Sequence, residues 1–244
     1  MTSIYLIRHG QASFGEVNYD RLSATGIEQA KLLGKQWRSH DISSQVREIQ
    51  NHIFTGNLER QIHTSAHFAS FANVQADSNI IPELNEFDHQ DILLTSEPKW
   101  ENLGQVSQHF TRDDASLAEL GRAFHLATMR WTSQKHCDEY NESWSQFKTR
   151  CVNAINQIAE IMSDIPTKDQ DGANEALVFT SGGVISVVLQ HLLQLSDEHC
   201  LKMMNQIRNT SVTKLVLRKS GLTLDYFNNY QHLLTTDGRL LTYR

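Results

Sequence analysis

Two short runs of β-branched and large apolar residues stand out near the start of the chain, at residues 4–7 and 52–55. Continuous apolar runs of this length are typical of strands that are buried on both faces of a sheet. The first run breaks off within three positions into Arg8, His9 and Gly10. We therefore expect two buried strands, the first of which ends in an unusual group of polar residues.

A segment with a helical spacing of apolar residues follows each predicted strand. The first segment covers residues 23–39, where Thr25 and Glu28 have the spacing of a capping box. The second helix begins near Asn57. Strand and helix, repeated in this order, form the doubly wound pattern of an α/β fold with a mostly parallel sheet.

The second half of the chain repeats this pattern after an interval of a different kind. Residues 87–146 are polar and rich in His, Gln, Ser and Asp, and only weak helical stretches interrupt them, so we expect an inserted, mostly helical cap. A helix is predicted over residues 147–162, and a buried strand that turns through glycines into an apolar helix over residues 176–193. Residues 211–233 read as two alternating strands, a hairpin at the edge of the sheet.

Composition limits the classes of protein that this chain can represent. A length of 244 residues suits one large domain, 1–244, that carries the insertion. The 22 Lys and Arg residues against 28 Asp and Glu residues give a net charge of −6, which does not favour a nucleic-acid partner. The apolar run at residues 182–195 is too short to span a bilayer, and we find no signal peptide, so no membrane partner is expected.

The cysteines indicate the compartment. The chain has 3 cysteines without a C-x-x-C motif, which argues against both a disulfide framework and a zinc knuckle. We therefore expect a reduced, cytoplasmic protein. The oligomeric state is left open, with a homodimer as one candidate.

Arg8 and His9 are the first candidates for chemistry, because they lie at the carboxyl end of the first predicted strand. Ligands of open α/β sheets bind at that end, and Gly10 would allow a sharp turn or a close approach to a ligand. A capped strand with a solvated arginine and a packed histidine is the alternative.

Further stretches match a known family in the same order. They are "LSATGIEQA" in the first helix, "TGNLERQIHTS" after the second strand, "PELNEFDH", "ESWSQFKTR", and the strand with Gly-Gly at residues 176–183. With the opening R-H-G, the chain resembles the histidine phosphatase superfamily, whose fold is shared with cofactor-dependent phosphoglycerate mutase. The resemblance spans nearly the whole chain and implies a three-layer α/β/α sandwich that acts on a small phosphorylated substrate.

The resemblance also implies roles for individual residues. His9 would be the nucleophile and form a phosphohistidine, while Arg8 and Arg60 would bind the phosphoryl oxygens through their charged, forked donors. Glu86 would give a proton to the leaving oxygen and later take one from water. No metal and no cofactor are expected for this chemistry. Taken alone, Arg60 also fits a helix surface and Glu86 a solvated position after a strand.

Two departures from the family pattern bear on activity. Members of the family usually carry a second histidine directly before Gly-Gly, where this chain has Ser181, a neutral and shorter donor. The backbone N–H groups at Ser181, Gly182 and Gly183 could still bind phosphate at the start of the following helix. His232 or His89 could fill the gap as donors.

The second departure lies close to His9. Mutases of the family carry a serine and an asparagine where this chain has Ala12 and Gly15, for which Ser13 or Asn18 could substitute. The predicted cap shows no stretch that matches a mutase. We therefore favour a phosphomonoester hydrolase over a mutase.

Three other hypotheses remain open. A serine hydrolase would use Ser181 with Asp225 and His232, which follow in the required order. A phospho-ligand-binding or regulatory protein would keep the phosphate pocket with little turnover. His63 and His67 have the spacing of a helical metal pair, although a solvated helix face explains them as well.

Overall fold

The computed structural model describes residues 2–13, 20–40, 52–74, 77–97, 100, 102, 105, 114–166, 174–235 and 238–243. Two compact units divide the chain: the first comprises Met1–Glu86 and Cys151–Arg244, and the second comprises Phe87–Arg150. Helix α6 (Trp144–Asp164) runs through the boundary at residue 150.

The first unit is built on a six-stranded sheet with the order β3-β2-β4-β1-β5-β6. The strands are β1 (Thr2–Arg8), β2 (Ile53–Thr55), β3 (Asn79–Ile80), β4 (Asn174–Thr180), β5 (Val212–Arg218) and β6 (Gly221–Asn229). The first four strands of the spatial order are parallel, whereas β5 and β6 run antiparallel to their neighbours. The fold is therefore α/β with a mixed, mostly parallel sheet, and the predicted hairpin lies at the sheet edge.

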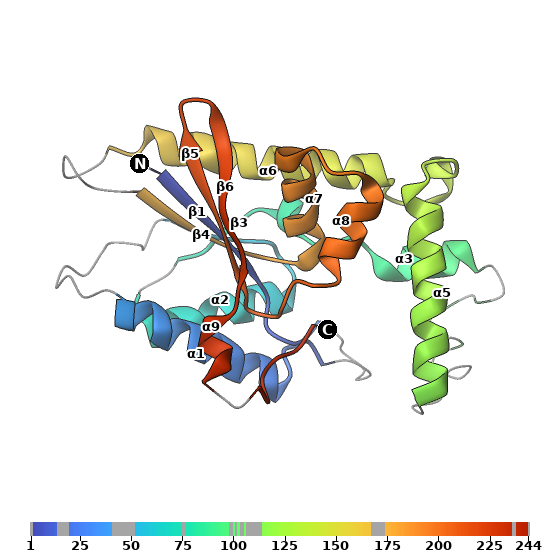
Figure 1. Cartoon of the computed structure of the whole chain (residues 1–244), viewed down its shortest axis with the longest axis horizontal. Coiled ribbons are helices and arrows are strands. Elements are labelled where there is room, and N and C mark those ends of the chain that lie inside the picture. The colour runs from blue at the N-terminus through green and yellow to red at the C-terminus, as the bar shows by residue number, and fades with distance from the viewer. Residues whose placement is uncertain are drawn as a thin grey trace. The chain divides into compact units, whose positions relative to one another are not determined.

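Helices cover both faces of this sheet (Figure 1). Helices α1 (Ala24–His40) and α2 (Glu59–Ala72) lie on one face, and α7 (Gly182–Leu193) and the later part of α6 lie on the other. The other short helices among the described residues of this unit are η2 (Pro82–Leu84), α8 (Asp197–Met204) and α9 (Gln231–Leu234). Helix, sheet and helix make the three layers that the family resemblance implies.

The hydrophobic core explains why the sheet is covered on both faces. In β1, Ile4 and Leu6 face the opposite side from Ile7, and all three are fully buried. Ile7 packs in a cluster with Leu33 of α1 and Phe68 of α2. Burying each such side chain stabilises the fold by roughly 1.5–3 kcal/mol relative to leaving it exposed, so the apolar run at the start of the chain belongs at the centre of the sheet.

Two predicted helix starts differ from the observed ones. Helix α1 begins at Ala24, and the N–H of Gly26 donates to Ser23 Oγ (3.1 Å), so Ser23 caps the helix rather than Thr25. Helix α2 begins at Glu59, two positions after the predicted start at Asn57. Asn57 instead donates its N–H to Asn85 Oδ1 (2.9 Å), a bond to a distant segment that the local pattern does not contain.

The second unit has an aromatic core of its own. Its described helices are α3 (His89–Ser96), α5 (Asp114–Thr132), η3 (Cys137–Glu139) and the first part of α6. The ring of Trp131 lies 5.1 Å from Phe87, 5.0 Å from Trp144 and 5.8 Å from Phe147, measured between centroids. These residues fall almost entirely within the predicted insertion at 87–146, and its role as a cap stays a prediction.

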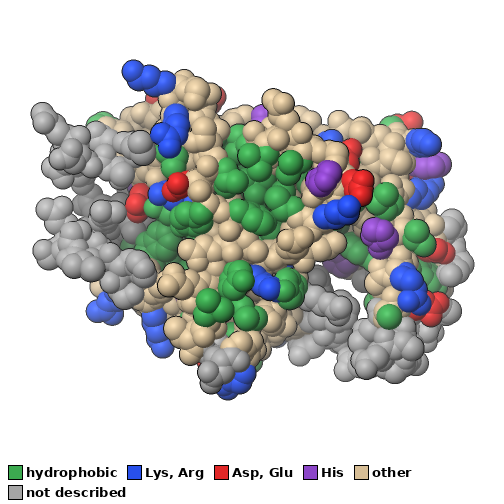
Figure 2. All heavy atoms as spheres, viewed as in Figure 1, with side chains coloured by type: hydrophobic (Ala, Val, Ile, Leu, Met, Phe, Trp, Pro, Cys, Tyr) green, Lys and Arg blue, Asp and Glu red, His purple; other side chains and the backbone are tan. Residues whose placement is uncertain are grey.

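The surface gives two further observations. On the face in Figure 2, the Lys and Arg side chains of the described residues are scattered among hydrophobic and uncharged surface. Among the described residues, no helix combines the length and hydropathy that crossing a bilayer requires.

Candidate active site

The carboxyl edge of the parallel strands gathers the predicted site residues of the first unit. Strands β1 and β4 pair in register with Arg8 opposite Thr180, so His9 and Ser181 follow at neighbouring strand ends. Helix α2 begins a few residues after β2 and brings Arg60 to the same edge. Because parallel strands end together, residues far apart in the sequence meet there.

Two hydrogen bonds determine the tautomer of His9. The ring Nδ1 lies 2.7 Å from the carbonyl oxygen of Gly10, which can only accept, so Nδ1 carries the hydrogen. Arg60 Nε donates to His9 Nε2 over 3.2 Å, which requires a lone pair on Nε2. Both contacts therefore assign the free lone pair of the ring to Nε2.

The surroundings of His9 also keep the ring uncharged. The side chain is buried, with 5% relative exposure. Burial, and then the positive charges of Arg60 and Arg8, hold the pKa of His9 well below its ordinary value. A neutral imidazole with a free nitrogen is the form that can attack an electrophile.

Backbone contacts fix the position of His9. Its N–H donates to the carbonyl of Thr180 (2.8 Å), and its carbonyl accepts from Asn209 Nδ2 (3.1 Å). The next N–H, of Gly10, donates to Thr64 Oγ1 on α2 (2.9 Å). A Cβ at Gly10 would lie 2.5 Å from the carbonyl oxygen of Gly26, so this glycine permits the approach of α1 to the loop.

The segment after α9 is connected to the same loop by side-chain hydrogen bonds. Gln29 of α1 accepts from the N–H of Gln11 (2.9 Å) and donates to Thr242 Oγ1 (2.7 Å). Thr242 Oγ1 in turn donates to Asn209 Oδ1 (2.8 Å), and Asn209 holds the carbonyl of His9. Side-chain hydrogen bonds therefore connect Thr242 to the predicted nucleophile through a single residue.

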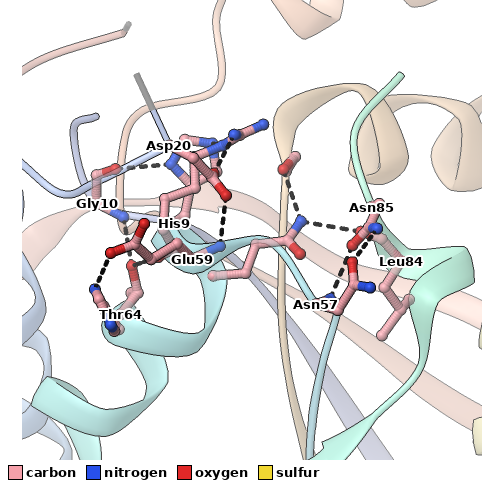
Figure 3. A network of polar contacts seen from close by, with 12 residues as sticks. His9, Gly10, Asp20, Asn57, Glu59, Thr64, Leu84 and Asn85 are labelled. Atoms are coloured by element: carbon pink, nitrogen blue, oxygen red, sulfur yellow. Dashed lines mark hydrogen bonds and ion pairs between the residues drawn. The ribbon is translucent and has the colours of Figure 1, made fainter. Parts of the chain in front are cut away.

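Arg60 is held by an acidic partner in addition to His9. Its Nη1 lies 2.5 Å from Asp20 Oδ1, and Asp20 Oδ2 accepts from the N–H of Glu59 (2.7 Å). Figure 3 shows Asp20 and Glu59 beside His9 and Gly10. Asp20 thus fixes both the guanidinium and the first turn of α2, where a carboxylate also interacts favourably with the helix dipole.

Arg8 and Glu86 both lie at the start of α7. A Cβ at Gly182 would stand 3.6 Å from Arg8 Nε, so the Arg8 side chain passes close to the first residue of the helix, and its Nη1 donates to the carbonyl of Ile207. Glu86 is half-buried, and its Oε2 accepts from the N–H of Gly183 (3.0 Å). A cation, a carboxyl group and helix N–H groups therefore converge at one place.

Ser181 precedes α7 and is fully buried. Its hydroxyl makes no capping bond to the helix and instead accepts from Gln61 Nε2 (2.8 Å). Gln61 Nε2 also donates to the carbonyl of Leu84 (3.1 Å), near the pair formed by Asn57 and Asn85 in Figure 3.

A family comparison accounts for this combination of fold and site. The model of the histidine phosphatase superfamily (branch 1) matches residues 4–230. The chain belongs to this superfamily. No curated protein sequence matches it.

Solved structures with the same fold include proteins named as phosphatases and as a mutase, all at low sequence identity to this chain. A phosphoserine phosphatase mutant from Entamoeba histolytica, in complex with phosphoserine, has a TM-score of 0.61 at 17% identity, covering 96% of this chain and 100% of its own. A phosphoglycerate mutase from Bacillus anthracis has a TM-score of 0.61 at 18% identity and coverages of 96% and 95%. A putative α-ribazole-5'-P phosphatase from Escherichia coli has a TM-score of 0.58 at 20% identity and coverages of 94% and 97%.

The residues of the serine hydrolase hypothesis are not assembled as a catalytic triad in this histidine phosphatase superfamily member. Ser181 Oγ is bonded to Gln61, and Asp225 pairs with Lys214 (3.0 Å) on the sheet edge. His232 Nε2 lies 2.9 Å from Thr210 Oγ1. A triad needs the base to bond the nucleophile, so the geometry argues against this hypothesis.

The structure also bears on the residues that could have replaced the missing donors of the family pattern. Burial lowers the pKa of His232 to about 4, so it is not a cationic donor at neutral pH, and His89 begins α3 in the second unit. Ser13 is buried, with its N–H donating to the carbonyl of Arg21 (2.8 Å). Gly15 and Asn18 lie outside the described residues.

The histidine pair on α2, His63 and His67, lies on a partly solvated face of the helix. His63 is exposed and lies 3.8 Å from Glu59 Oε1, and His67 is half-buried on the same helix. Within the described part of the chain, no three His, Cys, Asp or Glu side chains come together as a metal site requires. The expectation that the protein works without a metal or cofactor stays a prediction.

Four polar residues near the site were not found from the sequence: Asp20, Gln61, Thr64 and Asn209. Their roles depend on bonds to residues between 40 and 200 positions away, namely Arg60, Ser181, Gly10 and His9. Only the motif neighbour Arg60 could have drawn attention to Gln61, because the two follow each other at the start of α2.

Proposed function

We propose that this protein is a phosphomonoester hydrolase that acts through a phosphohistidine on His9 Nε2, without a metal ion. One observation carries the proposal. The ring of His9 is buried and neutral, its Nδ1–H is bound to the carbonyl of Gly10, and its unprotonated Nε2 accepts from the guanidinium Nε of Arg60 over 3.2 Å. A poised nucleophile beside a fixed cation suits the attack on a phosphoryl group, which spreads negative charge over its oxygens.

In the first step, the phosphate of the substrate binds between Arg8, Arg60 and the start of α7. The Nε2 lone pair of His9 forms the P–N bond while the bond from phosphorus to the leaving oxygen breaks. Protonated Glu86 gives its proton to that oxygen, which departs as an alcohol. The contact between Arg60 Nε and His9 Nε2 is replaced in this complex by contacts to phosphoryl oxygens.

In the second step, water attacks the phosphorus atom and the P–N bond breaks. Glu86, now ionised, takes the proton of the water, which regenerates neutral His9 and releases inorganic phosphate. Ser181 stands where related proteins usually carry a second histidine, and we propose that its hydroxyl and the N–H of Gly182 donate to the phosphoryl oxygens. These donors are weaker than an imidazolium, so we expect slow turnover.

The test is a panel of phosphomonoesters, assayed with and without a chelator, for the wild type and His9→Ala. We expect turnover that is insensitive to the chelator and absent from the variant. Brief incubation followed by an alkaline quench should leave an acid-labile phosphate on His9. Label on Ser181, or activity retained in His9→Ala, would contradict the proposal.

A second candidate function is a phospho-ligand-binding protein with little or no turnover, and the neutral Ser181 favours it. The two functions differ in one measurement. A binder would retain inorganic phosphate or vanadate without releasing phosphate from any member of the panel. Mutase chemistry would instead move the phosphate within a phosphorylated sugar acid and release none of it.

A further inference from the structure

Gln61 and Ser181 form a buried polar pair between α2 and the start of α7. Both residues have 0% relative exposure, and Gln61 Nε2 lies 2.8 Å from Ser181 Oγ. Gln61 directly follows Arg60, so two successive residues of α2 bond to the residues after two neighbouring strands. Arg60 bonds to His9 after β1, and Gln61 bonds to Ser181 after β4.

The carbonyl of Leu84 fixes the orientation of the Gln61 amide. This oxygen can only accept, and it lies 3.1 Å from Nε2, so the NH₂ group faces both Leu84 and Ser181. Ser181 Oγ must therefore accept the hydrogen bond from Gln61. The single hydrogen of the Ser181 hydroxyl is left for another acceptor. Its oxygen accepts no capping bond from the N–H groups of α7.

Gly56 makes room for this arrangement. A Cβ at position 56 would stand 2.1 Å from Gln61 Oε1, well inside the closest approach of real atoms. The amide oxygen therefore occupies space that any other residue at position 56 would fill. The position of Gln61 is constrained on both sides, by the carbonyl of Leu84 and by the backbone of Gly56.

We propose that Gln61 is a positioning residue that holds the Ser181 hydroxyl as a hydrogen-bond donor to the phosphoryl group on His9. The inference rests on the proposed function. Because one lone pair of the Ser181 hydroxyl accepts from Gln61, rotation of the hydroxyl about its C–O bond is restricted. Its hydrogen can therefore point in fewer directions. A donor that is oriented before the reaction stabilises developing charge without reorganising, which is how hydrogen bonds accelerate such steps.

A double-mutant cycle tests this coupling. Ser181→Ala removes the donor and should lower kcat about a hundredfold, and Gln61→Met, of similar volume, only releases the hydroxyl and should lower kcat about tenfold. The double variant should equal Ser181→Ala to within about twofold, since nothing is left for Gln61 to orient. KM should stay nearly constant, as expected for a contact made in the transition state.

The chain offers a matched control for the loss of a buried glutamine. Gln190 of α7 is also buried, and its Nε2 donates to Asp197 Oδ1 (2.7 Å) and the carbonyl of Leu195 (3.2 Å). Gln190→Met should lower the free energy of unfolding and leave kcat unchanged. If Gln61→Met does not fold, Gln61→Leu replaces it: leucine also lacks a donor for the Ser181 hydroxyl and should lower kcat about tenfold.

The outcomes separate this inference from the proposed function. If the wild type forms phosphohistidine but the effects of Gln61→Met and Ser181→Ala on kcat simply multiply in the double variant, the inference alone is overturned. An unchanged kcat in Ser181→Ala would overturn it as well. A wild type without turnover would contradict the proposed function. The same double-mutant cycle would then be measured on the dissociation constant of vanadate. If the effects of the two single variants on that constant simply multiply, the role of Gln61 is overturned there as well.

Discussion

His9 shows how few contacts are needed to set the chemical state of one residue. Its Nδ1–H is bound by the carbonyl of the next residue, so the tautomer is fixed locally, whereas its neutral charge depends on burial and on Arg60, 51 positions along the chain. The R-H-G motif was sufficient to suggest that a nearby acceptor holds one ring nitrogen of His9. The burial of His9 and its contact with Arg60 could be seen only in the folded structure.

Glu86 gives a prediction at the same scale. Glu86→Gln keeps the size of the side chain and can still accept from the N–H of Gly183, but it has no proton to give to a leaving oxygen. We expect kcat/KM, which reports the phosphorylation step alone, to fall most, by about 10²–10⁴-fold, for alkyl phosphates, and to fall little for activated aryl phosphates. Phosphate affinity should not change.

The measurement is a plot of kcat/KM against the pKa of the leaving group for wild type and variant. An equal loss across all substrates would remove Glu86 from the role of acid. Asp20 is the carboxylate to examine next in that case, because it pairs with Arg60, which contacts His9.

At the scale of elements, the sequence predicted which segments form strands and helices better than where they begin. The buried strands and the edge hairpin are confirmed because apolar runs and alternation record burial directly. Helix starts depend on single hydrogen bonds, and at the start of α1 it is Ser23 Oγ that accepts an N–H, that of Gly26. Local spacing could not distinguish Ser23 from Thr25 as the cap.

The site was less predictable than the elements that carry it. The motifs indicated Arg8, His9 and Arg60, because these residue types have a chemistry of their own. Gln61 and Asn209 have no such signature, and they matter only through the atoms beside them. The assignment of catalytic roles stays a prediction until the variants are assayed.

The contact of Thr242 with α1 and with the loop before β5 leads to a second prediction. Thr242→Val keeps the shape of the side chain but removes the hydroxyl that bonds both Gln29 and Asn209. Leaving two buried amides partly unpaired should lower the free energy of unfolding by about 1–3 kcal/mol. We also expect kcat to fall, because Asn209 holds the carbonyl of His9.

Urea unfolding and kcat of Thr242→Val are to be compared with those of Thr242→Ser, which keeps the hydroxyl. Near-wild-type values in the serine variant and a loss in the valine variant support the contact. Equal losses in both variants would attribute the effect to packing instead.

For the whole molecule, two buried neutral histidines predict sensitivity to acid. Burial lowers the pKa of His232 to about 4, and the pKa of His9 is lowered too, whereas an unfolded histidine titrates near 6.5. Between these values the unfolded chain binds protons that the folded chain does not. Stability is therefore complete above about pH 6.5 and falls as the pH drops toward 4, by about 3 kcal/mol from His232.

The free energy of unfolding of the wild type and His232→Gln, measured by urea between pH 7 and pH 4, checks this expectation. Glutamine can still donate to Thr210 Oγ1, so the variant should be comparably stable at pH 7 and lose less stability in acid. Parallel curves for the two proteins would show that His232 does not contribute.

The position of β1 between β4 and β5 has a consequence for synthesis. A ribosome makes β1, which leads into His9, before the other strands of the sheet, yet the neighbours of β1 come from residues 174–180 and 212–218. For most of translation, the nascent chain therefore exposes an apolar strand with both edges open, which is the situation in which chaperones bind and strands aggregate. A chain released before β5 would lack the second neighbour of β1 and the contact of Thr242 with Asn209, so we expect a premature stop before β5 to abolish the site.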